Sequence, residues 1–133
     1  MKKNCLLDIT ELETEFSTPL GTNKAVNKVS LSLENGETLA IVGESGSGKS
    51  TAARVITGLL PPRLGDIQFN GKPLPKDYRS RNKDQLRHAQ MIYQMADTAL
   101  NPRQRIRSII GRPLSFYLGL SGQKKEDRIR DLL

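Results

Sequence analysis

Aromatic residues are scarce in this 133-residue sequence, which has no Trp and only three Phe and three Tyr. Stacking of bases on aromatic side chains is a main contribution to the binding of single-stranded nucleic acid, so the sequence offers little material for that function. Cysteine is also scarce. The single Cys5 excludes an intrachain disulfide and a metal site built on several thiolates, and it is typical of a reducing compartment.

Long apolar runs are missing as well. The first residues are basic, but Asp8 interrupts the sequence before an apolar run develops, which excludes a signal peptide. No stretch approaches the roughly 20 apolar residues that a transmembrane helix needs. We therefore expect a soluble, cytoplasmic chain.

The net charge of +7 is unevenly distributed along the chain. Residues 1–75 carry equal numbers of basic and acidic side chains, whereas residues 76–133 carry thirteen basic and six acidic ones. Such a basic half could face an acidic partner, a membrane surface or nucleic acid. A solvated surface with scattered charges is the alternative, and the sequence leaves both open.

Alternating and continuous apolar patterns predict strands in the first part of the chain. Residues 6–14 and 29–34 alternate, and residues 17–23 between them are rich in turn formers. Residues 38–42 form an uninterrupted apolar run, which is typical of a strand buried on both faces. Residues 66–69 alternate again and end at Asn70-Gly71, a hairpin signal.

Helical spacing dominates the rest. Apolar residues from Ala52 to Leu60 predict a helix that begins near Lys49 and stops at Gly58. The polar stretch 73–87 predicts a loop with a short helix, and residues 91–94 predict a short strand. Helical patterns follow over 106–118 and 124–133. The last has no glycine or proline to end it, so we expect the chain to stop inside an element.

The strongest motif lies between the apolar run and the first helix. Gly43, Gly48, Lys49 and Ser50 match G-x-x-x-x-G-K-[ST], the phosphate-binding loop, in the strand–loop–helix context that this pattern requires. The glycines let the backbone approach a phosphate closely, and the N–H groups of residues 46–51 would form an anion-binding nest at a helix N-terminus.

The motif assigns nucleotide contacts to most of the loop. Lys49 is expected to reach the β- and γ-phosphates, the Ser50 hydroxyl to ligate Mg²⁺, and Thr51 to support the α-phosphate. The cofactors expected are ATP and Mg²⁺. The predicted cofactor-binding residues of this loop are Gly43, Ser45, Gly46, Ser47, Gly48, Lys49, Ser50 and Thr51.

The residues around the loop resemble a known family. Residues 29–51 look like the nucleotide-binding subunit of an ABC transporter. Residues 91–94, followed by Ala99-Leu100-Asn101-Pro102-Arg103, resemble the Q-loop of the subgroup that powers dipeptide and oligopeptide import. The resemblance covers nearly the whole chain. It departs from the family after Gln94, where the usual Gln-Asp-Pro is replaced by Gln94-Met95-Ala96-Asp97.

The resemblance implies two further site residues. Gln94 would be the Q-loop glutamine, which contacts Mg²⁺ or the attacking water and reports to the membrane subunit. Phe16 stands where this family places the aromatic residue that stacks on adenine; a core phenylalanine is the alternative. The resemblance also implies an α/β fold, with a P-loop NTPase core, an antiparallel β subdomain and the start of a helical subdomain.

Several family motifs are missing from the sequence. The Leu-Ser-Gly-Gly-Gln signature, the Walker B strand and the switch histidine do not occur. We interpret Leu120-Ser121-Gly122-Gln123 as the opening of a helix, with Ser121 as its N-cap. We therefore expect a truncated ATP-binding domain, with the β subdomain and P-loop core in residues 1–102 and the start of the helical subdomain in 103–133. The catalytic general base is expected beyond Leu133.

The function implied is an ABC-type transport ATPase that couples ATP hydrolysis to import of peptides or similar solutes. Its implied partners are membrane-spanning permease subunits and a second ATPase subunit, in a homo- or heterodimer at the cytoplasmic side of the membrane. A non-hydrolysing nucleotide-binding module, an ABC-type ATPase acting on nucleic acid, and an unrelated P-loop kinase are the alternatives. The Q-loop match to importers argues against a nucleic-acid partner.

Overall fold

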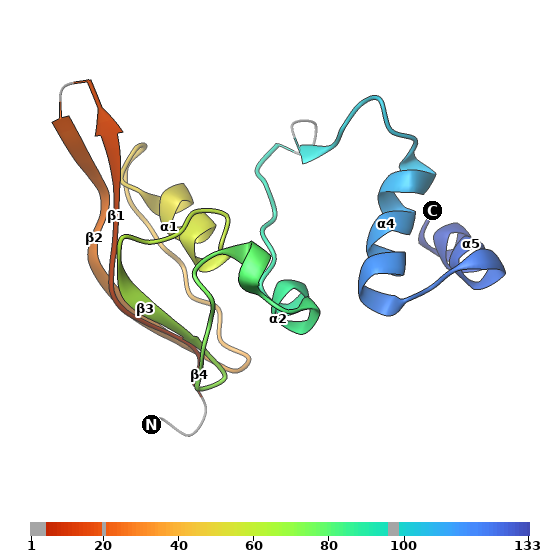
Figure 1. The fold of residues 1–133 in the computed structure, drawn as a ribbon, viewed down its shortest axis with the longest axis horizontal. Coiled ribbons are helices and arrows are strands. Elements are labelled where there is room, and N and C mark those ends of the chain that lie inside the picture. Colours follow the sequence, from red (N-terminus) through yellow and green to blue (C-terminus); the bar gives the residue numbers. More distant parts are fainter. Residues whose placement is uncertain (1–4, 20, 96–98) are drawn as a thin grey trace. The chain divides into compact units, whose positions relative to one another are not determined.

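The computed structural model describes residues 5–19, 21–95 and 99–133. They form two compact units, Met1–Met91 and Ile92–Leu133, each with its own internal packing (Figure 1). The division into residues 1–102 and 103–133 stays a prediction.

The first unit is built on one antiparallel sheet. The strand order is β2-β1-β3-β4, and the bounds are Cys5–Thr18 for β1, Gly21–Glu34 for β2, Leu64–Phe69 for β3 and Lys72–Pro73 for β4. Each neighbouring pair is antiparallel. This confirms the antiparallel β subdomain that the family resemblance implies.

The turns of the sheet agree only partly with the sequence patterns. The predicted turn at 17–23 is too long, because Ser17 pairs with Thr22 and Thr18 with Gly21, so the strands continue almost to the tip. Turn-forming residues can sit in a ladder when the opposite strand supplies their backbone partners. At the β3–β4 turn, Asn70 and Gly71 have φ of 50° and 70°, which confirms the predicted hairpin.

A hydrophobic core forms where helix α1 (Lys49–Ile56) packs on the sheet. The helix contributes Ala52 and Val55, three residues apart and therefore on the same face. The strands and the segment after β4 contribute the rest of this core: Ile9, Leu12, Val26, Ile67 and Leu74. The helix ends at the predicted place, where Gly58 has φ of 77°.

The segment 38–42 differs from its prediction as a strand buried on both faces. It has no strand assignment. Leu39 is 45% exposed, Ile41 49% and Val42 92%. A buried parallel strand needs a neighbour on each side, and no described residue pairs with this segment. Its apolar side chains therefore lie at the surface.

The prediction of a short strand over 91–94 is also wrong. Residues 91–95 form no strand, and Ile92 is 96% exposed. The physical reason is the same, since no described strand pairs with this stretch. Residues 96–98, where the sequence departs from the family pattern, lie outside the described residues.

Between β4 and residue 91 the chain forms a short 3-10 helix, η1 (Tyr78–Ser80), and helix α2 (Lys83–His88). This confirms the predicted loop with a short helix. Arg81 lies between the two and is 5% exposed. Its Nε donates to the Pro75 carbonyl at 2.9 Å, while neither Nη atom has a protein partner. Burial lowers the pKa of the Arg81 guanidinium, and the Asp77 carboxylate opposes that shift.

The second unit contains helices α4 (Ile106–Leu118) and α5 (Gly122–Leu132), as the helical patterns predict. They pack closely at Gly111, where an added Cβ would lie 3.2 Å from Ile129 Cδ1. Arg107 and Glu126 join the two helices at 2.6 Å. Ser121 takes the N-cap position of α5, which confirms the prediction, and its side chain makes no capping hydrogen bond. Among the described helices, none is long and apolar enough to cross a membrane.

Candidate phosphate-binding site

The glycine-rich loop leads from the exposed segment 38–42 into α1. It closes a turn in which the Ser47 N–H donates to the Glu44 carbonyl at 3.2 Å. Gly46 and Gly48 have φ of 83° and 93°, in the left-handed region that favours glycine. The loop is exposed from Gly43 to Ser47. Its backbone is therefore accessible where the motif requires it.

Gly48 is the residue that the structure constrains most. It is the N-cap of α1 in the left-handed conformation, and an added Cβ would collide with the Ala25 carbonyl of β2. This close approach of Gly48 to Ala25 holds the loop against strand β2. No side chain caps α1, and its first turn carries no acidic residue. The first N–H groups of this helix therefore have no side-chain acceptor, which suits an incoming anion.

The Lys49 ammonium lies over the loop. Nζ donates to the carbonyls of Gly43 at 2.7 Å and Glu44 at 2.6 Å, and lies 3.2 Å from Ser47 Oγ. These neutral acceptors hold the positive charge close to the helix N-terminus. The Ser50 side chain is exposed one residue further on, and Thr51 is half-buried.

Phe16 lies in strand β1 of the sheet against which the loop packs. It pairs with Asn23 across the β1–β2 ladder, two residues from Ala25, on which the loop is seated. Phe16 is 42% exposed and does not belong to the hydrophobic core. Phe16 is therefore not a core residue, which was the alternative considered from the sequence.

Gln94 belongs to the other unit. It is exposed in a bend that follows Tyr93. No group of three or more His, Cys, Asp and Glu side chains in the described ranges could hold a metal ion.

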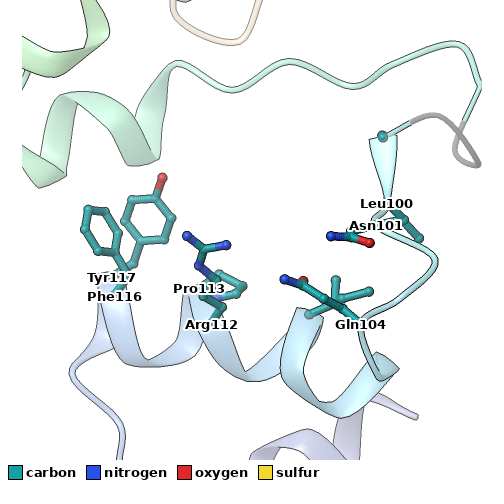
Figure 2. A pocket seen from close by; sticks show the side chains of 9 residues that line it. Leu100, Asn101, Gln104, Arg112, Pro113, Phe116 and Tyr117 are labelled. Atoms are coloured by element: carbon teal, nitrogen blue, oxygen red, sulfur yellow. The ribbon is translucent and has the colours of Figure 1, made fainter.

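The second unit contains a groove that the sequence patterns did not reveal. It has a volume of about 580 Å³ and runs along α4 and the residues before it. Figure 2 shows the side chains that line it, with Arg112, Phe116 and Tyr117 rising from α4 and Asn101 and Gln104 from the preceding segment. The groove combines aromatic walls, two amides and one guanidinium. Helical spacing of Arg112 and the aromatic residues was its only sequence signal.

Known proteins have sequences similar to that of this chain. The family model described as "ABC transporter" matches residues 26–133. The nickel import ATP-binding protein NikE of Brucella abortus (strain 2308) is 43% identical over 108 residues, which cover 81% of this chain and 41% of that protein. NikE of Escherichia coli (strain K12) is 41% identical, with coverage of 81% and 40%. The chain thus spans about two-fifths of the length of these relatives.

Solved structures share the fold. The ATP-binding cassette MJ0796, a dimer in a post-hydrolysis state bound to ADP and Pi, aligns with 95% of this chain and 55% of its own, with a TM-score of 0.73 at 22% identity. The ADP conformation of MJ1267, an ATP-binding cassette of an ABC transporter, is 33% identical over 55% of this chain and 27% of its own, with a TM-score of 0.50. The predicted α/β P-loop fold is confirmed. Because the family model matches most of its residues, the chain belongs to the ABC transporter family.

Proposed function

We propose that residues 43–51 bind the triphosphate of ATP and that the chain is the ATP-binding part of an ABC-type import ATPase. The observation that carries the proposal is Gly48, whose left-handed backbone seats the loop on Ala25 and leaves α1 without a capping side chain. The first N–H groups and the positive end of the helix dipole then attract phosphate. The glycine conformations fit a nucleotide bound at close range.

Each loop residue has a role in this proposal. The N–H groups around Ser45, Gly46 and Ser47 donate to phosphate oxygens, and Thr51 supports the α-phosphate. Lys49 exchanges its neutral loop acceptors for the charged β- and γ-phosphate oxygens, which are stronger acceptors. Ser50 and Gln94 would hold Mg²⁺, which neutralises phosphate charge when bound.

Phe16 is proposed to stack on the adenine. Its exposed ring lies on the hairpin that also seats the phosphate loop, so one sheet would hold both ends of the nucleotide. Stacking of a base on an aromatic ring contributes about 1–3 kcal/mol.

Hydrolysis requires groups beyond those in the loop. We propose that the general base comes from outside residues 1–133 and that a second ATPase subunit supplies donors to the far side of the γ-phosphate. The short coverage of the curated relatives supports this, because well over half of their length has no counterpart here. The dimeric cassette among the similar structures supports a paired arrangement.

The groove on α4 is proposed as the surface that meets a membrane permease subunit. Its aromatic side chains give apolar contact area, and Arg112 and the two amides give polar contacts. Interfaces commonly combine such aromatic and Arg anchors. The ATPase would then be peripheral, on the cytoplasmic side of the membrane.

The cargo is proposed to be a peptide or a similar small solute, after the resemblance of residues 91–103 to the Q-loop of peptide importers. The relatives named NikE import nickel, so a nickel cargo is the second candidate. Uptake of radiolabelled dipeptide and of ⁶³Ni²⁺ by cells with and without the gene would separate the two.

The nucleotide proposal is tested by the binding of Mg-ATP to the wild-type protein and to Lys49→Ala. We expect the variant to lose ATP-dependent thermal stabilisation, because it lacks the one charge aimed at the β- and γ-phosphates. Ser50→Ala should weaken binding of Mg-ATP more than that of metal-free ATP. Equal stabilisation of wild type and Lys49→Ala would remove the phosphate loop from the site.

Two alternative functions predict different experimental results. A non-hydrolysing module would bind ATP but release no phosphate even as the full-length protein with its partners. An ATPase acting on nucleic acid would bind DNA with a steep dependence on salt. Three arginines of the basic half, Arg107, Arg128 and Arg130, each pair with an acidic side chain of α5.

A further inference from the structure

Four charged side chains form a cluster on the sheet near Phe16. The Glu13 side chain is only 7% exposed, and its Oε2 lies 3.6 Å from Lys24 Nζ and 3.9 Å from Arg63 Nη1. Arg63 Nε also pairs with Glu15 Oε1 at 2.9 Å. We call Glu13, Glu15, Lys24 and Arg63 the hairpin ion-pair cluster. A buried carboxylate is costly without partners, so Lys24 and Arg63 compensate the burial of Glu13.

Arg63 connects this cluster to the helix of the phosphate loop. It follows α1 by seven residues, after Pro61 and Pro62, whose rings restrict the backbone. Its own N–H donates to the Glu13 carbonyl at 2.9 Å. One backbone bond and two side-chain contacts therefore join the exit of α1 to β1.

Lys24 connects the cluster to the phosphate loop from the other side. It pairs with Glu15 across the β1–β2 ladder and precedes Ala25, whose carbonyl faces Gly48. Phe16 follows Glu15 directly. The cluster thus lies between the seat of the phosphate loop and the proposed base-stacking ring.

The pairing of β1 with β2 is irregular just before Phe16. Its register with β2 shifts three times between Ile9 and Glu15. Such bulges bend a strand and interrupt its ladder. The ion-pair cluster lies where the irregular part ends, because Glu13 stands within it and Glu15 begins the regular pairing that continues to Thr18.

We propose that the hairpin ion-pair cluster positions Phe16 and so sets the distance between the phosphate loop and the adenine stack. Arg63 is a positioning residue that acts through Glu15 and the β1 backbone without touching the nucleotide. The proposal rests on the proposed stacking of Phe16. Its consequence is that Arg63 contributes to recognition of the base and not to recognition of the triphosphate.

The test compares the affinities of the full-length protein for ATP and for inorganic triphosphate. Arg63→Gln should weaken ATP binding about fivefold to tenfold, a part of the roughly 5- to 150-fold loss expected when a stacking ring is removed. Binding of triphosphate should change by less than about twofold. Arg63→Lys, which keeps the charge, should recover part of the lost affinity. Arg54→Gln is the matched control, because Arg54 is an exposed basic residue of α1 that has no acidic partner among the described residues.

If Arg63 had only a general structural role, Arg63→Gln would weaken the binding of ATP and of triphosphate equally, and that result would overturn the proposal. Unchanged affinity for both ligands would also overturn it. If Arg63→Gln does not fold, Glu15→Gln removes the 2.9 Å ion pair from its other partner and should show the same selectivity.

Phe16→Ala separates this proposal from the one on which it rests. If Phe16→Ala keeps its ATP affinity, stacking fails and positioning fails with it. If Phe16→Ala weakens ATP binding but Arg63→Gln does not, only positioning fails. If both proposals hold, Arg63→Gln should have no further selective effect in the Phe16→Ala background, because coupled residues are not additive.

Discussion

The β1–β2 hairpin and the segment 38–42 are neighbours in the chain, yet their apolar side chains have opposite environments. Leu12 is 1% exposed in β1, whereas Leu39 is 45% and Val42 92% exposed. The hairpin brings its own partner, because a short turn returns the chain antiparallel to itself. The segment 38–42 runs into a helix, and no described strand lies beside it. An apolar segment therefore forms a buried strand only when another strand of the fold lies beside it.

The largest effect that this comparison predicts is on stability. Leu12→Ala should lower the free energy of unfolding of the 133-residue chain by about 2–5 kcal/mol, because it leaves a cavity under α1. Leu39→Ala, the same change at an exposed site, should stay within about 0.5 kcal/mol. Urea denaturation of the two variants measures both.

The comparison becomes sharper in a longer chain. If strands from outside residues 1–133 cover the segment 38–42, Leu39→Ala should become costly in the full-length protein while the cost of Leu12→Ala stays the same. An equal, small cost of Leu39→Ala in both chains would contradict a buried central strand at 38–42.

The next effect compares two glycines of the phosphate loop. Gly48→Ala should cost about 1–3 kcal/mol for the collision with the Ala25 carbonyl, in addition to about 1–2 kcal/mol for the left-handed backbone. Gly46→Ala should show only the backbone cost, because its added Cβ would meet nothing within 4 Å. Thermal unfolding with and without Mg-ATP measures both. A variant Gly48→Ala that binds ATP like wild type would mean that the loop does not need its seat on β2.

The sequence was sufficient where local chemistry decides the structure. The phosphate loop, the Asn70-Gly71 turn and helices α1, α4 and α5 follow from spacing and turn chemistry within a few residues. The seat of Gly48 on Ala25 could not be predicted, because it depends on which strand lies beside the loop. The strands expected at 38–42 and 91–94 failed for the same reason, since strand formation depends on a partner that the local pattern does not contain.

Arg81 extends the comparison to polar groups, because it is buried without partners for its Nη atoms. The lowered pKa of Arg81 means that burial penalises its charged form. Since the unfolded state holds that proton more tightly, the penalty is fully present below the folded-state pKa and is relieved only as pH rises above it. Across neutral pH, stability should not depend on this group.

Two substitutions distinguish the effect of the Arg81 charge on stability from the effect of its apolar stem. Arg81→Met, which removes the unpaired charge and keeps most of the apolar stem, should be about as stable as wild type or more stable. Arg81→Ala also loses the packing of the stem and should cost about 1–3 kcal/mol. Denaturant unfolding at two neutral pH values measures both. If both variants lose the same stability, the guanidinium itself stabilises the fold.

The smallest effect compares the N-caps of α2 and α5, one in each unit. Asn82 Oδ1 accepts from the Gln85 N–H at 2.9 Å, and Gln85 Oε1 accepts from the Asn82 N–H at 3.0 Å, so α2 has a complete capping box. Ser121 makes no side-chain bond at the start of α5. Asn82→Ala should therefore cost about 1 kcal/mol and Ser121→Ala only a few tenths.

Hydrogen exchange would locate these two losses. The Leu86 N–H donates to the Asn82 carbonyl at 3.0 Å, whereas the Lys125 N–H lies at 3.4 Å from the Ser121 carbonyl. The exchange of Leu86 should accelerate in Asn82→Ala, because the first turn of α2 frays when its cap is lost. The exchange of Lys125 should hardly change in Ser121→Ala. A clear acceleration at Lys125 would mean that the Ser121 hydroxyl caps α5 in solution, and the contrast between the two helix starts would then disappear.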